Sequence, residues 1–292
     1  MGSKFMELLL NAVKDGLLLG GFYGAISVGL TISFGLLDVV NIAHPIFIIL
    51  GSYIAYVLNS TWGVDPLLAG LLPAPLFYWL GVAVYRVYYR SFERRGEESL
   101  RGLVFFFGIL FLIEVSLIIT YGVDYRLVSA GYIGRSLDLG GLSFAYRLLV
   151  PFLAGSLLTL ALFLFLTRSF YGKAIMGVSQ DRFALQLMGA DPVKIKTIAF
   201  GLSIATTSLA GALLIIIGPV EPSVGRVYIG RVFAVVVLGG MGSVGGTLVA
   251  AIIVGVAESL TSIFVGPAWS EAVSFALLLL ALAVRPSGLF GR

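Results

Sequence analysis

The chain has 292 residues, of which 59% are hydrophobic and 12% are charged, and its formal net charge is +4. Soluble domains carry roughly a quarter charged residues, so this composition excludes a soluble globular protein and indicates a polytopic membrane protein. The sequence has no cysteine and one histidine, which excludes disulfides, thiolate metal sites and clusters of metal ligands.

Apolar segments long enough to cross a membrane fill most of the chain, since a spanning helix needs about twenty apolar residues. We find eight such segments, at 16–37, 44–59, 64–86, 102–121, 146–167, 197–218, 231–264 (interrupted) and 270–284. An amphipathic stretch from Phe5 to Lys14 precedes the first. We therefore predict an all-α polytopic membrane protein with about eight transmembrane helices, in a single transmembrane domain over residues 1–292.

Charge predicts the orientation of these segments, because lysine and arginine favour cytoplasmic loops. The arginine-rich connection at 86–101 and the basic stretch at 168–196 are two segments apart, so both are expected inside, with 122–145 outside. Arg285 puts the C-terminus inside as well. From an outside loop near 219–230 the chain must then cross an odd number of times, so 231–264 is a broken span plus a partial one, or a re-entrant pair. The side of the N-terminus stays open.

Polar, glycine or proline residues interrupt two apolar runs, at 34–45 and at 238–246. Paired interruptions in the two halves of a membrane chain indicate a translocation pathway between broken helices. The alternative is close packing of helices through small residues. The two interpretations are equal for the glycines at 239–246, but Asp38, Asn41 and His44 favour the pathway for the first interruption. The candidate pathway residues here are Phe34, Asp38, Asn41, His44, Gly239, Gly240, Gly242, Gly245 and Gly246.

Glu114 and Glu258 lie well inside apolar segments, where ionisable groups are costly. Glu114 is in the middle of its segment, so it either faces a polar partner or is protonated, and we include it among the pathway candidates. Glu258 is nearer one end of its segment, which favours an interfacial position. The aromatic residues that approach the arginine-rich loop are interpreted as an interfacial belt. They are Phe77, Tyr78, Trp79, Tyr85, Tyr88 and Tyr89.

The stretch 168–196 combines positive charge with an apolar stripe formed by Ala174, Val178, Ala184, Leu185 and Met188. This spacing predicts a short amphipathic helix that ends at Gly189. Asp191 and Pro192 then open the next helix, as N-cap and first helical residue. Such a helix could bind a soluble partner or lie flat on the lipid surface, and helix physics alone leaves these alternatives even.

Nothing in the sequence predicts catalysis. There is no GxxxxGK[ST] phosphate loop, so the chain is not expected to hydrolyse ATP itself, and no serine lies in a nucleophile elbow. No basic patch interleaves with aromatic residues as a nucleic-acid site would require.

Four motifs resemble permease subunits of branched-chain amino acid ABC importers (LivH-like). They are the run Gly29-Leu30-Thr31-Ile32-Ser33-Phe34-Gly35 with Asn41, Ala43 and His44; Gly172 to Gly189; Val237 to Gly246, continuing to Glu258; and Arg285 to Gly291. They occur in the family's order over residues 16 to 292. The sequence departs from the family pattern at Lys173, where arginine is common, and at Asp38 and Pro45, where small residues are usual.

The resemblance implies the ABC importer permease fold, in a multi-pass protein of a prokaryotic cytoplasmic membrane. It also implies four partners: a second permease subunit, homologous or identical; two cytoplasmic ATPase subunits that hold ATP and magnesium; and an extracytoplasmic binding protein that delivers a branched-chain amino acid. The segment 168–196 would be the coupling loop that docks in an ATPase groove. The candidate coupling residues are Lys173, Asp181, Arg182, Ala184, Gly189 and Asp191.

Two rival hypotheses need no ATPase. A secondary transporter or channel for a small polar solute would use membrane charges such as Glu114. A structural scaffold would lose no uptake when Asn41 and His44 are replaced.

Overall fold

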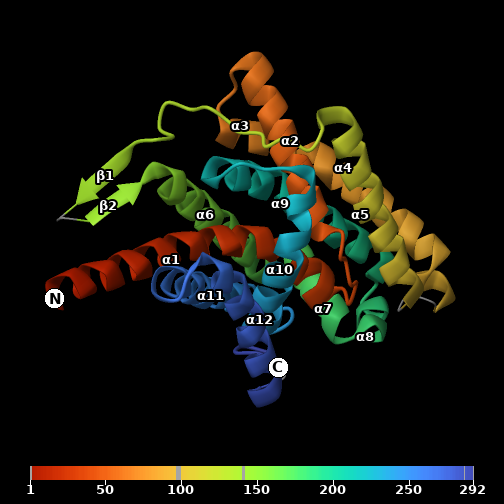
Figure 1. Ribbon diagram of the computed structural model, residues 1–292. Helices are drawn as coiled ribbons and strands as arrows, with labels where there is room; N and C mark the ends of the chain where they lie inside the picture. The colour runs from red at the N-terminus through yellow and green to blue at the C-terminus, as the bar shows by residue number, and fades with distance from the viewer. Residues whose placement is uncertain (1, 97–99, 140–141, 286, 292) are drawn as a thin grey trace.

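The computed structural model describes residues 2–96, 100–139, 142–285 and 287–291, and it is mainly helical (Figure 1). The helices of the first half are α1 (Gly2–Leu30), α2 (His44–Trp62), α3 (Pro66–Leu71), α4 (Ala74–Ser91), α5 (Leu100–Tyr121) and α6 (Tyr146–Arg168). Those of the second half are α7 (Phe170–Gln180), α8 (Arg182–Leu187), α9 (Pro192–Ile217), α10 (Gly225–Gly239), α11 (Val244–Phe264) and α12 (Pro267–Val284). Short turns are η1 (Thr31–Leu36), η2 (Glu93–Arg95) and η3 (Pro222–Val224).

Nine helical stretches of the described chain are long and apolar enough to span a membrane. This confirms the predicted all-α polytopic class, with one more span than the eight segments suggested. The additional span arises because the interrupted segment 231–264 forms two helices, α10 and α11. Together with α12 they make three crossings after the loop that follows α9. Arg285 therefore returns to the side of the membrane where α9 begins, as its charge required.

The N-terminal half of α1 lies on the outer side of the membrane, opposite to Arg285. The chain folds into a small antiparallel hairpin of β1 (Ser136–Leu139) and β2 (Leu142–Ala145) in the predicted outside loop. Lys14 of α1 donates a hydrogen bond to the Ser143 carbonyl at 2.5 Å and lies 5.4 Å from the centre of the Phe144 ring. Figure 1 shows the hairpin beside this part of α1. The amphipathic lead thus continues directly into the first span, and the N-terminus lies outside.

Helices α1 and α9 form the centre of the bundle. In both, 83% of the most apolar 18-residue window is buried, against 11% for α12. Helix α9 packs against α2 and α4, and α1 packs against α11 and α6. Small residues allow the close approach of α1 and α11, since a Cβ at Gly20 would lie 2.6 Å from the Ile252 Cα and one at Gly255 would lie 2.5 Å from the Gly16 carbonyl.

The predicted aromatic belt is only partly at the surface. Phe77, Tyr85 and Tyr88 are buried. Tyr85 and Tyr88 pack against Phe200 of α9 and Phe106 of α5, with ring centroids 5.5 and 5.2 Å apart. Periodicity could not separate the two faces of α4, because both are aromatic. The buried face joins α4 to α5 and α9, and only Trp79 of the predicted belt is largely exposed, at 62%.

Candidate functional site

The first helix interruption is a tightened helix end followed by an irregular loop. Helix α1 continues into the π-helical stretch η1, and the chain then leaves the helix at Asp38, whose φ of 57° lies in the left-handed region. A non-glycine residue there is strained, and both such strain and π-turns cluster at functional sites. Asp38 itself is exposed, and α2 has no side-chain cap, so Asp38 does not cap the helix that follows.

The second interruption is a glycine turn between α10 and α11. Gly240 and Gly242 have φ values of 96° and 82°, which L-residues rarely adopt. The C-terminal segment returns to this turn, where the backbone nitrogens of Leu289 and Phe290 donate to the carbonyls of Leu238 and Gly239 at 2.8 and 3.2 Å. The unpaired carbonyls at the end of α10 are therefore satisfied by the chain terminus.

The two interruptions meet in space although they lie about 200 residues apart in the sequence. A Cβ at Gly242 would lie 2.8 Å from the Gly35 carbonyl, and a Cβ at Gly35 would overlap the Gly242 backbone. Thr31 of η1 and Thr247 of α11 share a hydrogen bond of 2.7 Å. Phe34 packs against Phe233 of α10, with ring centroids 5.5 Å apart. Phe34 and Gly242 of the predicted pathway residues therefore meet at one junction of η1, α10 and α11.

Asn41 and His44 are fully buried. His44 Nε2 lies 3.2 Å from the Ile26 carbonyl, and a Cβ at Gly29 would lie 2.6 Å from the imidazole ring. In the described residues, His44 Nδ1 and the Asn41 amide nitrogen have no hydrogen-bond partner. Buried polar atoms are normally satisfied, so these two atoms mark a place where water or a polar solute would be stabilised.

Of the glycines predicted for the pathway, Gly239 and Gly246 pack together so closely that a Cβ on either would overlap the other's backbone. This is the packing role, whereas Gly245 is exposed and meets only the Phe163 ring, at 3.8 Å. The packing interpretation thus applies to Gly239 and Gly246, and the pathway role of Gly245 stays a prediction.

Glu114 lies apart from this junction. It is buried on α5. Arg226 at the start of α10 donates hydrogen bonds to it from Nη2 at 2.6 Å and from Nε at 3.1 Å. Arg226 and Gly239 are at opposite ends of α10, about 20 Å apart at 1.5 Å per residue. The expected polar partner of Glu114 is present, but the carboxylate does not join the helix interruptions.

The interfacial position expected for Glu258 is wrong. Its side chain is buried and accepts hydrogen bonds from Tyr23 of α1 at 2.5 Å, from Arg231 of α10 at 2.9 Å and from Ser274 of α12. Arg231 also lies 3.5 Å from Glu271. The sequence shows these residues on four separate helices, so their convergence could not be read from spacing.

The basic stretch between α6 and α9 forms two short helices instead of the single one predicted. Asp181 ends α7 and caps α8, accepting from the backbone nitrogens of Phe183 and Ala184 at 2.8 and 2.9 Å. Because Asp181 caps α8 in this way, the helix breaks there, although the apolar stripe continues past it. Ala174, Val178 and Leu185 are buried, but Ala184 and Met188 point to solvent.

The six predicted coupling residues are all exposed. Gly189 adopts φ 80°, which ends the loop helix, and Asp191 caps α9 by accepting from Val193 at 2.9 Å, both as predicted. The outer face of α8 is apolar despite its exposure. Phe183, Leu187 and Met188 expose 68%, 74% and 82% of their surfaces.

Glu93 joins this segment to the bundle, a role that the sequence analysis missed. It is a buried acceptor for Lys196 of α9 at 2.5 Å and for Tyr85 of α4 at 2.8 Å, and Arg182 of α8 lies 3.7 Å away. The only available signal was that Glu93 is one of three acids among the arginines of the preceding loop. Any movement of α8 therefore bears on the inner ends of α4 and α9.

A comparison with known protein families identifies the family of this chain. The family model described as "Branched-chain amino acid transport system / permease component" matches residues 12–282. The chain belongs to this family. It is therefore a transport permease component of the cytoplasmic membrane and not an enzyme, as the four motifs implied.

Relatives match this permease over nearly its whole length. The permease protein LivH of the high-affinity branched-chain amino acid transport system of Escherichia coli K12 is 28% identical, over 100% of this chain and 98% of its own. BraD of the corresponding Pseudomonas aeruginosa system is 27% identical over 97% and 96%. A probable LivH of Methanocaldococcus jannaschii is 24% identical over 98% and 96%. No solved structure matches the chain.

Proposed function

We propose that this permease imports branched-chain, hydrophobic amino acids, driven by ATP hydrolysis in separate cytoplasmic subunits. Membership of the permease family and the names of three near-full-length relatives support the substrate class. The observation that carries the pathway is the contact of the two helix interruptions, Gly35 against Gly242. Interrupted helices that meet inside a bundle offer backbone groups and joints for a solute path.

Helices α7 and α8 would be the docking segment for an ATPase subunit. Its apolar tip, formed by Phe183, Leu187 and Met188, suits a protein groove, and the basic residues around it suit the inner membrane side. In this proposal a second permease subunit completes the pathway, two ATPase subunits hold ATP and magnesium, and an extracytoplasmic binding protein delivers the amino acid.

Coupling would follow from the contacts of α8 with the bundle. When the ATPase subunits close, α8 moves, and the Glu93 contacts carry the displacement to the inner ends of α4 and α9. Helix α9 packs on η1, so its displacement reaches the interruption at 31–43. Such coupling requires that the ATPase bind the inward- and outward-facing states with different free energies.

Replacement of Gly189 by tryptophan tests the docking segment. Gly189 has φ 80° and open space around it, so a bulky side chain there blocks docking without a clash inside the bundle. We expect the variant to insert normally, but to lose uptake of leucine, isoleucine and valine in vesicles that hold the complete transporter, while ATP hydrolysis no longer responds to substrate.

Gly134→Trp is the matched control, because Gly134 has φ 94° and equally open surroundings in the outside loop. It carries the same backbone strain and bulk on the opposite side of the membrane, and should retain uptake. Unchanged uptake in Gly189→Trp would refute the docking role, and uptake that needs no ATPase subunit would favour a secondary transporter.

A further inference from the structure

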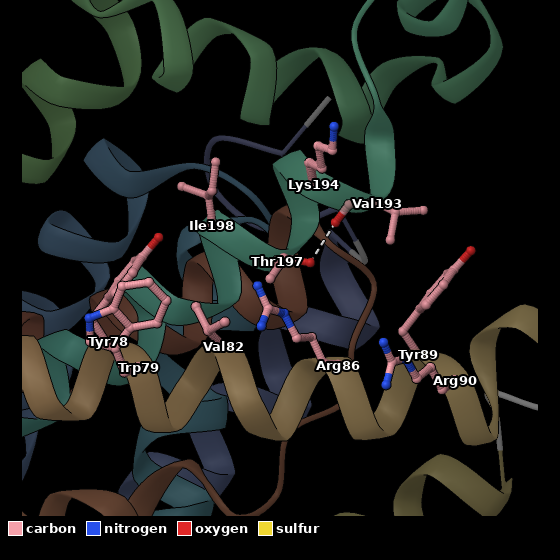
Figure 2. Close-up of a pocket in the computed structure, with 10 residues that line it drawn as sticks. All are labelled: Tyr78, Trp79, Val82, Arg86, Tyr89, Arg90, Val193, Lys194, Thr197 and Ile198. Carbon is pink, nitrogen blue, oxygen red and sulfur yellow. Dashed lines mark hydrogen bonds between the residues drawn. The ribbon is translucent and has the colours of Figure 1, made fainter.

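A groove of about 500 Å³ opens between α4 and the first turns of α9, outside the junction described above (Figure 2). Its lining residues are Tyr78, Trp79, Val82, Arg86, Tyr89, Arg90, Val193, Lys194, Thr197 and Ile198. Figure 2 shows Arg86 reaching from α4 toward Thr197 of α9, so the two helices together form the walls.

The groove is amphipathic along the membrane normal. Lys194 and Arg90 lie where α9 begins and α4 ends, which is the cytoplasmic side, and Arg86 is one turn deeper. Trp79 lies eleven residues before Arg90, about 16 Å further into the membrane. One end is therefore cationic and at headgroup depth, and the other is aromatic and at acyl-chain depth.

Within the described residues, the cations of the groove have almost no acidic partners. In the described part of the chain, neither Arg86 nor Arg90 forms an ion pair, and Lys194 meets only Asp191, at 3.9 Å and with its own side chain 81% exposed. Glu93, three residues after Arg90, is already bonded to Lys196. The cationic end of the groove thus attracts an anion.

We propose that this groove binds one acidic phospholipid of the inner leaflet. Its phosphate would lie between Arg86, Arg90 and Lys194, with an acyl chain along Trp79 and Ile198. A soluble anion satisfies only the basic end. A molecule that fills both ends needs a charged head and an apolar chain about 16 Å long, and basic pockets between helices on the cytoplasmic side suit such lipids.

The exposed face of α3 and α4 supports lipid as the occupant. Leu68, Leu72 and Leu76 are each more than half exposed, and in the chain they precede Trp79, at the apolar end of the groove. Because every cation near the membrane surface contributes roughly a fivefold preference for acidic headgroups, losing one of the three should lower the preference about fivefold.

Trp79 provides the readout, because the chain has only two other tryptophans, Trp62 and Trp269. The full chain with Trp62→Phe and Trp269→Phe is reconstituted in phosphatidylcholine vesicles containing a small fraction of a lipid brominated on its acyl chains. We expect brominated phosphatidylglycerol to quench Trp79 more strongly than brominated phosphatidylcholine. Arg86→Gln alone should lower that preference about fivefold, and Arg86→Gln with Arg90→Gln and Lys194→Gln should abolish it.

A charge-matched control carries Arg95→Gln, Arg168→Gln and Arg285→Gln, three exposed cations of the same membrane side but outside the groove. It should keep the preference. Equal quenching by both lipids in the parent chain, or a preference that survives the groove substitutions, would overturn the proposal. Relief of quenching by millimolar inorganic phosphate would identify a site for free anions instead.

A second test of the proposal uses the assembled transporter. Native mass spectrometry of the complex with its partner subunits should show retained phosphatidylglycerol that is lost with the three groove substitutions. A complex that retains no acidic lipid, with this face covered by a partner subunit, would contradict the lipid assignment.

Discussion

Ion pairs whose carboxylates are largely buried join the helices of this permease at the level of single residues. Arg226 and Glu114 join α10 to α5, Arg231 and Glu258 join α10 to α11, and Lys196 and Glu93 join α9 to the turn after α4. A buried charge is tolerated only when a partner and further hydrogen bonds replace its water. These pairs therefore specify which helices are neighbours, more than they add stability.

The Glu258 cluster leads to a prediction about stability. Glu258→Gln leaves the Arg231 guanidinium, whose side chain is 12% exposed, without its main carboxylate. Breaking a buried pair in this way costs about 3 kcal/mol, so the midpoint of thermal unfolding of the purified permease should fall clearly. The measurement is a thermal melt in detergent, followed by loss of monodisperse protein.

The double variant Arg231→Gln, Glu258→Gln is the matched comparison. Because it removes both charges, it should recover most of the loss, as the coupling energy of a double-mutant cycle. If the two substitutions simply add, the ion pair does not hold α10 to α11.

At the level of elements, the distinguishing feature is that the two helix interruptions contact one another and that α7 and α8 contact the spans. The π-helical end of α1 needs a partner without a side chain, and the glycine turn after α10 supplies it. Periodicity detects such interruptions as breaks in an apolar run. It does not show that they meet, because the contact involves residues about 200 positions apart.

A further prediction concerns the effect of a methyl group that blocks this contact. Gly35→Ala forces a Cβ into the Gly242 backbone, and overpacking of this kind costs about 1–3 kcal/mol. We expect uptake by the reconstituted transporter to fall strongly, because the two interruptions can no longer approach. Gly108→Ala, in the open middle of α5, should preserve uptake and even stabilise the helix slightly.

At the scale of the whole molecule, the number of crossings decides which surfaces meet which partners. The nine spans of the described residues put the start of α1 and the β-hairpin outside, and put α7, α8 and Arg285 inside. The proposed docking segment and the proposed lipid groove share that inner side. The outer loops face the solution from which a binding protein would deliver substrate.

Single cysteines can test this topology directly, because the natural sequence has none. In intact cells, Lys4→Cys and Tyr125→Cys should react with a membrane-impermeant maleimide, and Ser179→Cys and Arg285→Cys should react only after the membrane is opened. Labelling of Ser179→Cys in intact cells would contradict the cytoplasmic docking segment. Labelling of Lys4→Cys only after opening would contradict the nine-span count.

Much of the candidate site could be predicted from local patterns. Apolar runs predicted the spans, Asp191 and Gly189 predicted the helix boundaries, and the order of four motifs predicted the family. Those features depend on neighbours within about one turn of helix. The split at Asp181 was missed because its side chain caps a helix in the middle of an apolar stripe, and local cues conflict there.

The sequence by itself therefore determined that this protein crosses the membrane many times. It also determined where the helices are interrupted and which loops lie on the cytoplasmic side. Only the tertiary structure decided that Gly35 meets Gly242, that Glu258 is buried with Arg231, and that Glu93 joins α8 to α9. The physical reason is one of range. Hydrophobic length and helix capping are set by adjacent residues, whereas pairing of buried charges and backbone contact depend on which distant helices pack together.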